Sequence, residues 1–171
     1  MNRKKTLDLG SALETFSNGV RAYMDAASRE SVRLIGIRTG GVWLAQRMTT
    51  ALDLDEAPGE LNIAFYRDDF SRIGMHPTVE PSILDFDVND QHLLLIDDIL
   101  FTGRTVRAAM NEIFDYGRPA SIGLAVLVDR GGRELPVQAD VVGMEVSLET
   151  NEHVKLTGPE PLNLELCKVT P

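Results

Sequence analysis

The sequence has only one cysteine, Cys167, and no long apolar run. A lone thiol excludes an internal disulfide and a multi-cysteine metal site, and it agrees with a reducing compartment. A membrane-spanning helix needs roughly 20 consecutive apolar residues, and no stretch approaches that length. The opening MNRKKTLDLGS has basic residues without the apolar segment that a secretory signal carries behind them. We therefore expect a cytoplasmic protein that has no membrane partner.

Basic residues are outnumbered and histidines are few. The chain has 17 lysines and arginines against 26 aspartates and glutamates, which gives a formal net charge of -9. This balance argues against a broad attraction to nucleic acid or to an anionic membrane, so any site for a polyanion must be local. The three histidines, His76, His92 and His153, are scattered along the chain. We therefore expect no dedicated protein ligands for a transition metal.

The patterns that are present predict one α/β domain over residues 1–171, because the chain is 43% hydrophobic and contains no evident linker. Apolar residues at helical spacing predict helices over 11–28, over 41–52 and from Gly103 to a stop at Gly117 and Pro119. Short apolar runs predict strands over 32–37, 61–67, 93–99, 121–130 and 141–146. The polar segment 68–81 predicts a mobile loop, and the end of the chain predicts shorter strand pieces.

Strands that alternate with helices and are almost continuously apolar are typical of a parallel sheet covered on both faces. The sequence therefore predicts a doubly wound, mostly parallel sheet flanked by helices. In such sheets ligands bind beyond the carboxyl ends of the strands. We expect the chemistry in the turns after Ile37, Ile99 and Val128.

The segment 93–110, LLLIDDILFTGRTVRAAM, combines the groups that a ribose 5-phosphate requires. A helix N-terminus with a glycine and threonine hydroxyls supplies donors for a phosphate monoester. Asp97 and Asp98, one short loop away, can accept hydrogen bonds from vicinal sugar hydroxyls and favour positive charge on a ribose ring. Paired acids after a strand are also common as solvated turn residues, and a Thr-Gly turn is often only a helix cap. The combination is far more specific than either part.

Two other nucleotide-binding motifs do not match. The Gly-Lys-Ser/Thr ending of a nucleoside triphosphate loop is absent, and GIRTGG at 36–41 lacks the glycine spacing of dinucleotide-binding folds. By contrast, IDDILFTGRT at 96–105 resembles the phosphoribosyl pyrophosphate (PRPP) signature of type I phosphoribosyltransferases. Together with AFYRDDF, GIRTGG and the segment from Tyr116 to Asp140, it resembles the PyrR family, which comprises uracil phosphoribosyltransferases that also act as attenuators of pyrimidine operons. The resemblance covers about residues 30–147 closely.

The resemblance implies a type I phosphoribosyltransferase fold with a small hood of short strands and a flexible flap. It implies that the acids Asp97 and Asp98 are catalytic and hold the ribose hydroxyls. It assigns the remaining site residues as follows: the 5-phosphate to Thr102, Gly103, Arg104 and Thr105, the pyrophosphate to Arg38, Thr39 and Gly40, the flap base to Arg67, Asp68 and Asp69, and the uracil side to Asp129 and Arg130.

The implied reaction joins N1 of uracil to the anomeric carbon of PRPP and releases pyrophosphate, which yields UMP. Positive charge develops on the ribose and negative charge on the leaving group, so Mg²⁺ is expected as cofactor. Mg²⁺ suits this chain because it binds mainly through the phosphates and hydroxyls of PRPP and through water. The resemblance also implies a homo-oligomer, but no sequence feature specifies the number of subunits or a general base.

Two alternatives stay open. One is an RNA-binding attenuator with little catalysis, but several positions that are basic in the family lack a positive charge here. They are Gly40 and Gln138 in arginine positions, Gly132 in a histidine position and Met144 in a lysine position, so the sequence disfavours RNA binding. The other alternative is a phosphoribosyltransferase for another base, a purine or orotate, because the ribose phosphate motif does not select the base.

Overall fold

The computed structural model describes residues 7–26, 32–64 and 80–168. Its centre is a five-stranded sheet in which every strand pairing is parallel, with the order β2-β1-β3-β4-β5. The strands are β1 (Val32–Ile37), β2 (Gly59–Leu61), β3 (His92–Leu100), β4 (Ser121–Asp129) and β5 (Val141–Glu145). The central pair, β3 and β4, is the longest, and its register aligns Leu100 with Asp129.

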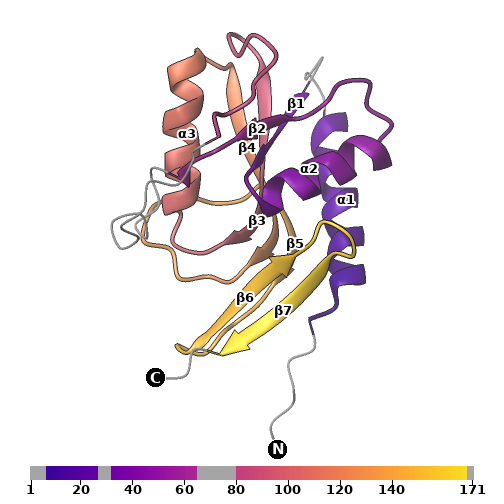
Figure 1. Cartoon of the computed structure of the whole chain (residues 1–171), viewed down its shortest axis with the longest axis vertical. Helices are drawn as coiled ribbons and strands as arrows, with labels where there is room; N and C mark the ends of the chain where they lie inside the picture. The colour runs from indigo at the N-terminus through magenta and orange to yellow at the C-terminus, as the bar shows by residue number, and fades with distance from the viewer. Residues whose placement is uncertain (1–6, 27–31, 65–79, 169–171) are drawn as a thin grey trace, which may run out of the picture.

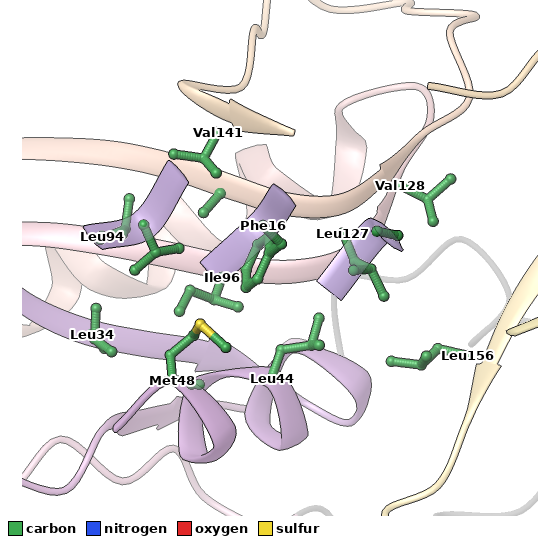
Figure 2. Packing of buried hydrophobic residues seen from close by; sticks show 14 of the residues in the cluster. Phe16, Leu34, Leu44, Met48, Leu94, Ile96, Leu127, Val128, Val141 and Leu156 are labelled. Atoms are coloured by element: carbon green, nitrogen blue, oxygen red, sulfur yellow. The ribbon is translucent and has the colours of Figure 1, made fainter. Parts of the chain in front are cut away.

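Helices cover both faces of the sheet. In Figure 1, α1 (Leu9–Asp25) and α2 (Gly40–Ala51) lie on one side and α3 (Arg104–Tyr116) on the other. Side chains of a strand alternate between faces, so Leu94 and Ile96 of β3 belong to the core under α1 and α2, while Leu93 and Leu95 belong to the core under α3. Figure 2 shows the first of these cores, where Phe16 of α1 lies over the sheet beside Leu44 and Met48 of α2. The doubly wound α/β architecture predicted from the sequence is confirmed.

The end of the described chain forms a small antiparallel hairpin, β6 (Glu152–Thr157) and β7 (Asn163–Lys168), which we call the hood. The hood is a sheet of its own, drawn below the main sheet in Figure 1. Its inward residues Val154, Leu156 and Leu164 join the core under α1 and α2. The prediction of short terminal strand pieces is therefore confirmed.

One predicted strand is wrong. Residues 61–67 read as a strand, but β2 ends at Leu61, and residues 62–64 are not in a strand. After β2 the backbone hydrogen bonds of a strand give way to hydrogen bonds of the Asn62 side chain. Its Oδ1 accepts from the amide of Ala64 at 3.1 Å, and its Nδ2 donates to the carbonyl of Glu80 at 2.6 Å. Ile63 is buried, so the apolar pattern reflects core packing and not a strand.

Within the described ranges, no helix has both the length and the apolar character that a membrane crossing needs. The helix predicted over 11–28 begins at Leu9, where Asp8 caps it by accepting from the amide of Ser11 at 3.0 Å. The single domain over 1–171 stays a prediction, since it includes residues outside these ranges.

Candidate active site

The candidate site lies where the strand order reverses. Within the sheet, β2 continues on one side of β1, while β3, β4 and β5 continue on the other, so the switch falls between β1 and β3. The connections that leave these two strands lead to helices on opposite faces, and this opens a crevice beyond the carboxyl ends of the strands. The predicted pyrophosphate turn at 38–40 and the predicted ribose phosphate segment at 97–105 flank this crevice.

The two acids lie inside β3, near its carboxyl end. Asp97 is buried, with only 4% of its surface exposed, and its Oδ1 accepts from the amide of Asp98 at 2.9 Å. Asp98 is half-buried, and its Oδ1 accepts from the amide of Ile99 at 3.0 Å. Each carboxylate is thus oriented by the strand that carries it.

Asp98 also lies against the turn after β1. A Cβ atom added to Gly40 would stand 2.5 Å from Oδ2 of Asp98, a distance that real Cβ atoms do not adopt. The absence of a side chain at position 40 therefore makes room for the carboxylate. The structure thereby brings together an acid of the ribose segment and a glycine of the pyrophosphate turn.

Helix α2 begins at this point because its glycines permit close approach. A Cβ at Gly41 would stand 2.3 Å from the carbonyl oxygen of Ile96, so the helix start packs directly on the backbone of β3. Thr39 precedes the helix, and the peptide bond from Arg38 to Thr39 is cis. The first turn of a helix has amides without partners in the helix itself, and those at 40–42 have no acceptor among the described residues.

Arg38, predicted to face pyrophosphate, is already engaged by two acids. Its Nε and Nη2 lie 3.1 and 3.0 Å from Oε2 of Glu60, and its Nη1 lies 2.6 Å from Oε2 of Glu80. Its backbone amide donates to the carbonyl of Leu61 at 2.9 Å. The guanidinium therefore ties the turn to β2 and to the segment that begins at residue 80, and a role toward pyrophosphate stays a prediction.

The turn into α3 is held by a second loop. Gly103 adopts a left-handed φ of 91°, which glycine tolerates best. The carbonyl of Thr102 accepts from the amides of Glu134 and Leu135 at 3.0 and 3.1 Å. The guanidinium of Arg104 binds Glu134 through two nitrogens, at 2.9 and 2.8 Å. The predicted phosphate turn is thus shaped by the segment that follows β4.

The same turn presents amide donors to the crevice. The amide of Arg104 donates to Oγ1 of Thr102 at 3.2 Å, and that of Arg107 donates to the carbonyl of Gly103 at 3.0 Å. The amides of Thr105 and Val106 have no acceptor in the described part of the chain. Two helix starts, α2 and α3, therefore carry unpaired amides on either side of the acids, and both are suited to bind anions.

The predicted uracil side forms a cavity of about 480 Å³ at the ends of β4 and β5. Asp129 accepts from the amide of Gly131 at 2.8 Å and forms a short ion pair with Arg133. The guanidinium carbon of Arg130 lies 3.9 Å from the centroid of the Phe101 ring, and its Nη2 donates to the carbonyl of Glu152 in the hood at 3.3 Å. Arg130 thus bridges the main sheet and the hood.

Sequence reasoning missed two of the groups around this cavity. Glu145, at the end of β5, aligns with Asp129 and lines the cavity. Phe101 contacts Arg130 from the turn after β3, and its position inside the PRPP signature, between the acids and Thr102, was a signal that could have drawn attention to it. The flap residues Arg67, Asp68 and Asp69 lie outside the described residues.

No group of three histidine, cysteine or acidic side chains that could hold a metal occurs in the ranges described. The site does contain two adjacent carboxylates, Asp97 and Asp98, and carboxylate oxygen is the donor type that Mg²⁺ prefers. One or two carboxylates suffice for an ion that is held largely by substrate phosphates and water. The donor set therefore fits Mg²⁺ that enters with a phosphorylated substrate.

Comparison with known proteins agrees with this geometry. The phosphoribosyl transferase domain family matches residues 13–160. The chain is 54% identical over 168 residues to a protein of Nitrosococcus oceani named bifunctional protein PyrR, covering 97% of the chain and 95% of the relative. It is 50% identical over 159 residues to the bifunctional protein PyrR of Pseudomonas paraeruginosa, covering 93% and 94%.

Solved structures show the same fold at low identity. A hypoxanthine-guanine phosphoribosyltransferase of Bacillus anthracis superposes with a TM-score of 0.68 at 14% identity, covering 90% of this chain and 88% of that one. A hypoxanthine phosphoribosyltransferase of Trypanosoma cruzi gives 0.62 at 20% identity, covering 87% and 80%. The predicted fold and the predicted resemblance are both confirmed. The chain belongs to the phosphoribosyltransferase family and, within it, to the PyrR proteins.

Proposed function

We propose that the protein transfers the ribose 5-phosphate of PRPP to N1 of uracil, which forms UMP and releases pyrophosphate. One observation carries the proposal: two helix starts with unpaired amides flank a pair of carboxylates at the switch point of the sheet. PRPP has the matching order of groups, a phosphate at one end, hydroxyls in the middle and a diphosphate at the other end. Each group of PRPP thus meets a complementary group of the chain.

The 5-phosphate binds at the start of α3. The amides of Thr105 and Val106 and the positive end of the helix dipole attract its negative charge. Gly103 lets the backbone approach the phosphate closely, and Thr102 adds a hydroxyl. Arg104 contributes through the loop that it holds with Glu134, because its guanidinium is already bound there.

The pyrophosphate binds at the start of α2, where Thr39, Gly40 and Gly41 offer backbone amides. Asp98 lies against this turn and accepts hydrogen bonds from the ribose hydroxyls. Its negative charge stabilises the positive charge that develops on the ribose as the bond to pyrophosphate breaks. Asp97 supports the same charge from its buried position in β3.

Phosphoribosyltransferases use Mg²⁺ together with PRPP, and we propose the same for this protein. Asp97 and Asp98 are the residues that would hold the ion, together with the hydroxyls and phosphates of PRPP. When bound, Mg²⁺ neutralises negative charge on the departing pyrophosphate. Arg67, Asp68 and Asp69 are proposed to flank the flap that excludes water from the reacting ribose.

Uracil enters the cavity at the ends of β4 and β5. Its two carbonyl oxygens need donors and its N3-H needs an acceptor. Arg130 supplies donors, and backbone groups of the loop after β4 can supply the rest. Asp129 acts indirectly, because its carboxylate already binds Arg133 and the amide of Gly131. Its part is to hold the shape of the cavity.

Pyrophosphate release tests the proposal, measured with PRPP, Mg²⁺ and each of four bases in turn: uracil, orotate, hypoxanthine and adenine. We expect turnover with uracil and loss of turnover when EDTA removes the metal. The variant Asp98→Asn, purified in the same way, controls for a contaminating enzyme. Turnover with a purine or orotate and none with uracil would contradict the base assignment and keep the phosphoribosyltransferase reaction.

A second function is supported by the name of the relatives, which describes them as bifunctional. We propose that it is regulation of pyrimidine genes, with UMP as the signal. Direct RNA attenuation is the less favoured form of this regulation, because the net charge is -9 and several basic positions of the family are lost. Self-association into a homo-oligomer is proposed from the resemblance, and light scattering of the purified protein would determine the number of subunits.

A further inference from the structure

An exposed aromatic residue contacts two arginines, Arg130 and Arg133, that line the proposed uracil cavity. Phe101 follows β3 directly, and 43% of its surface is exposed, while its neighbour Leu100 is buried. The carbonyl of Phe101 accepts from Nη1 of Arg133 at 2.8 Å, so the backbone at this point is anchored to the loop after β4. The ring is therefore held in place without being part of the core.

The ring is covered by a guanidinium. Cζ of Arg130 lies 3.9 Å from the ring centroid, well inside the range of a cation-π contact. Nη2 of Arg130 donates to the carbonyl of Glu152, but its Nε is buried and has no hydrogen-bond partner in the described part of the chain. Among the described residues, one polar contact orients the guanidinium, and the aromatic face of Phe101 also supports it.

The Cδ2 and Cε2 atoms of the ring lie next to Gly132. A Cβ atom at this position would stand 2.6 Å from Cε2 of Phe101, and Gly132 has a left-handed φ of 75°. Gly131 has a similar φ of 68°, but a Cβ there would meet no atom within 4 Å. Position 132 therefore has a steric reason to be glycine that position 131 lacks: the ring of Phe101 occupies the space where a side chain would start.

We infer that Phe101 is a positioning residue for base selection: its ring holds Arg130 at the cavity at the ends of β4 and β5, and Gly132 is needed to leave room for that ring. This inference rests on the proposed function, because it gives Arg130 a base to contact. The ring does not touch the reacting atoms. Its effect reaches the base through Arg130, so the affinity for the base should change and the affinity for PRPP should not.

Steady-state kinetics of Phe101→Leu and Phe101→Tyr test the inference. Leucine keeps apolar bulk without an aromatic face, and tyrosine keeps the face. We expect Phe101→Leu to raise KM for uracil roughly fivefold, the size of one cation-π contact. In Phe101→Leu, KM for PRPP and the midpoint of thermal unfolding should stay at parental values. Phe101→Tyr should keep the parental KM for uracil. Equal changes in both KM values, or no change in either, would overturn the inference.

The glycines provide a matched pair. Both Gly132→Ala and Gly131→Ala place a side chain at a left-handed φ, but only the first meets the ring. We expect Gly132→Ala to raise KM for uracil above the value of Gly131→Ala, and the difference measures displacement of Phe101. Equal KM values for the two variants would contradict the steric part of the inference.

A spectroscopic readout separates this inference from the proposed reaction. A guanidinium over a ring should give an arginine Nε-H proton signal shifted upfield by the ring current, assigned by its loss in Arg130→Lys. We expect Phe101→Leu to abolish that shift and Phe101→Tyr to keep it. If the parental protein has this signal and no turnover with uracil, the proposed function fails, while the placement of Arg130 by the ring of Phe101 stands. If the parental signal is unshifted, the positioning role fails whatever the activity.

Discussion

The charge of Asp98 should be worth about a hundredfold in turnover. The variant Asp98→Asn keeps the shape of the side chain. Its amide oxygen can still accept the hydrogen bond that Oδ1 of Asp98 accepts from the amide of Ile99 at 3.0 Å. A full charge about 5 Å from a ribosyl cation contributes about 3 kcal/mol at an effective dielectric constant of about 20. That energy corresponds to a rate loss of about 100-fold to 200-fold.

The assay is pyrophosphate release at saturating PRPP and uracil, with the free energy of unfolding measured on the same preparation. We expect the unfolding free energy to change by less than about 1 kcal/mol, because the substitution is nearly isosteric and also removes a charge next to buried Asp97. A kcat within threefold of the parental value would refute the reasoning, because the carboxylate would then not face the charge that develops. A large loss of stability would instead show that Asp98 supports the fold.

Three further predictions follow from contacts in the same crevice. Thr102→Val removes the hydroxyl that caps the amide of Arg104, and we expect KM for PRPP to rise about tenfold with little change in KM for uracil. Thr102→Ser keeps the hydroxyl and should keep the parental KM for PRPP. A normal KM for PRPP in Thr102→Val would mean that this turn holds no phosphate. Gly40→Ala would place a Cβ 2.5 Å from Oδ2 of Asp98; we expect kcat to fall at least about tenfold, whereas Gly10→Ala in α1, whose Cβ would lie 3.4 Å from its nearest neighbour, should leave kcat unchanged. Filter binding to the leader of a pyrimidine operon should show weak retention with and without UMP, and tight retention that depends on UMP would contradict the predicted loss of RNA binding.

The strongest patterns of the sequence predicted the elements that the structure contains. The apolar runs 32–37 and 121–130 match β1 and β4, and the helix predicted to end at Gly117 ends at Tyr116. These elements are set by local periodicity and by glycine or proline stops, which a linear sequence displays. The strand predicted over 61–67 was wrong because the buried Ile63 gives the apolar pattern of a strand. The hydrogen bond from Asn62 to the carbonyl of Glu80 joins residues far apart in the sequence, so the sequence did not indicate it.

The sequence by itself determined the fold class and the identity of the ribose phosphate segment, because the acids, the glycine and the helix start are neighbours along the chain. Only the tertiary structure decided which partners each side chain takes. It brings Asp98 against Gly40, engages Arg104 with Glu134, and stacks Arg130 on Phe101. The physical reason is that these contacts join segments at the carboxyl ends of parallel strands, which meet at one edge of the sheet. The residues of each pair are 29 or more positions apart in the sequence.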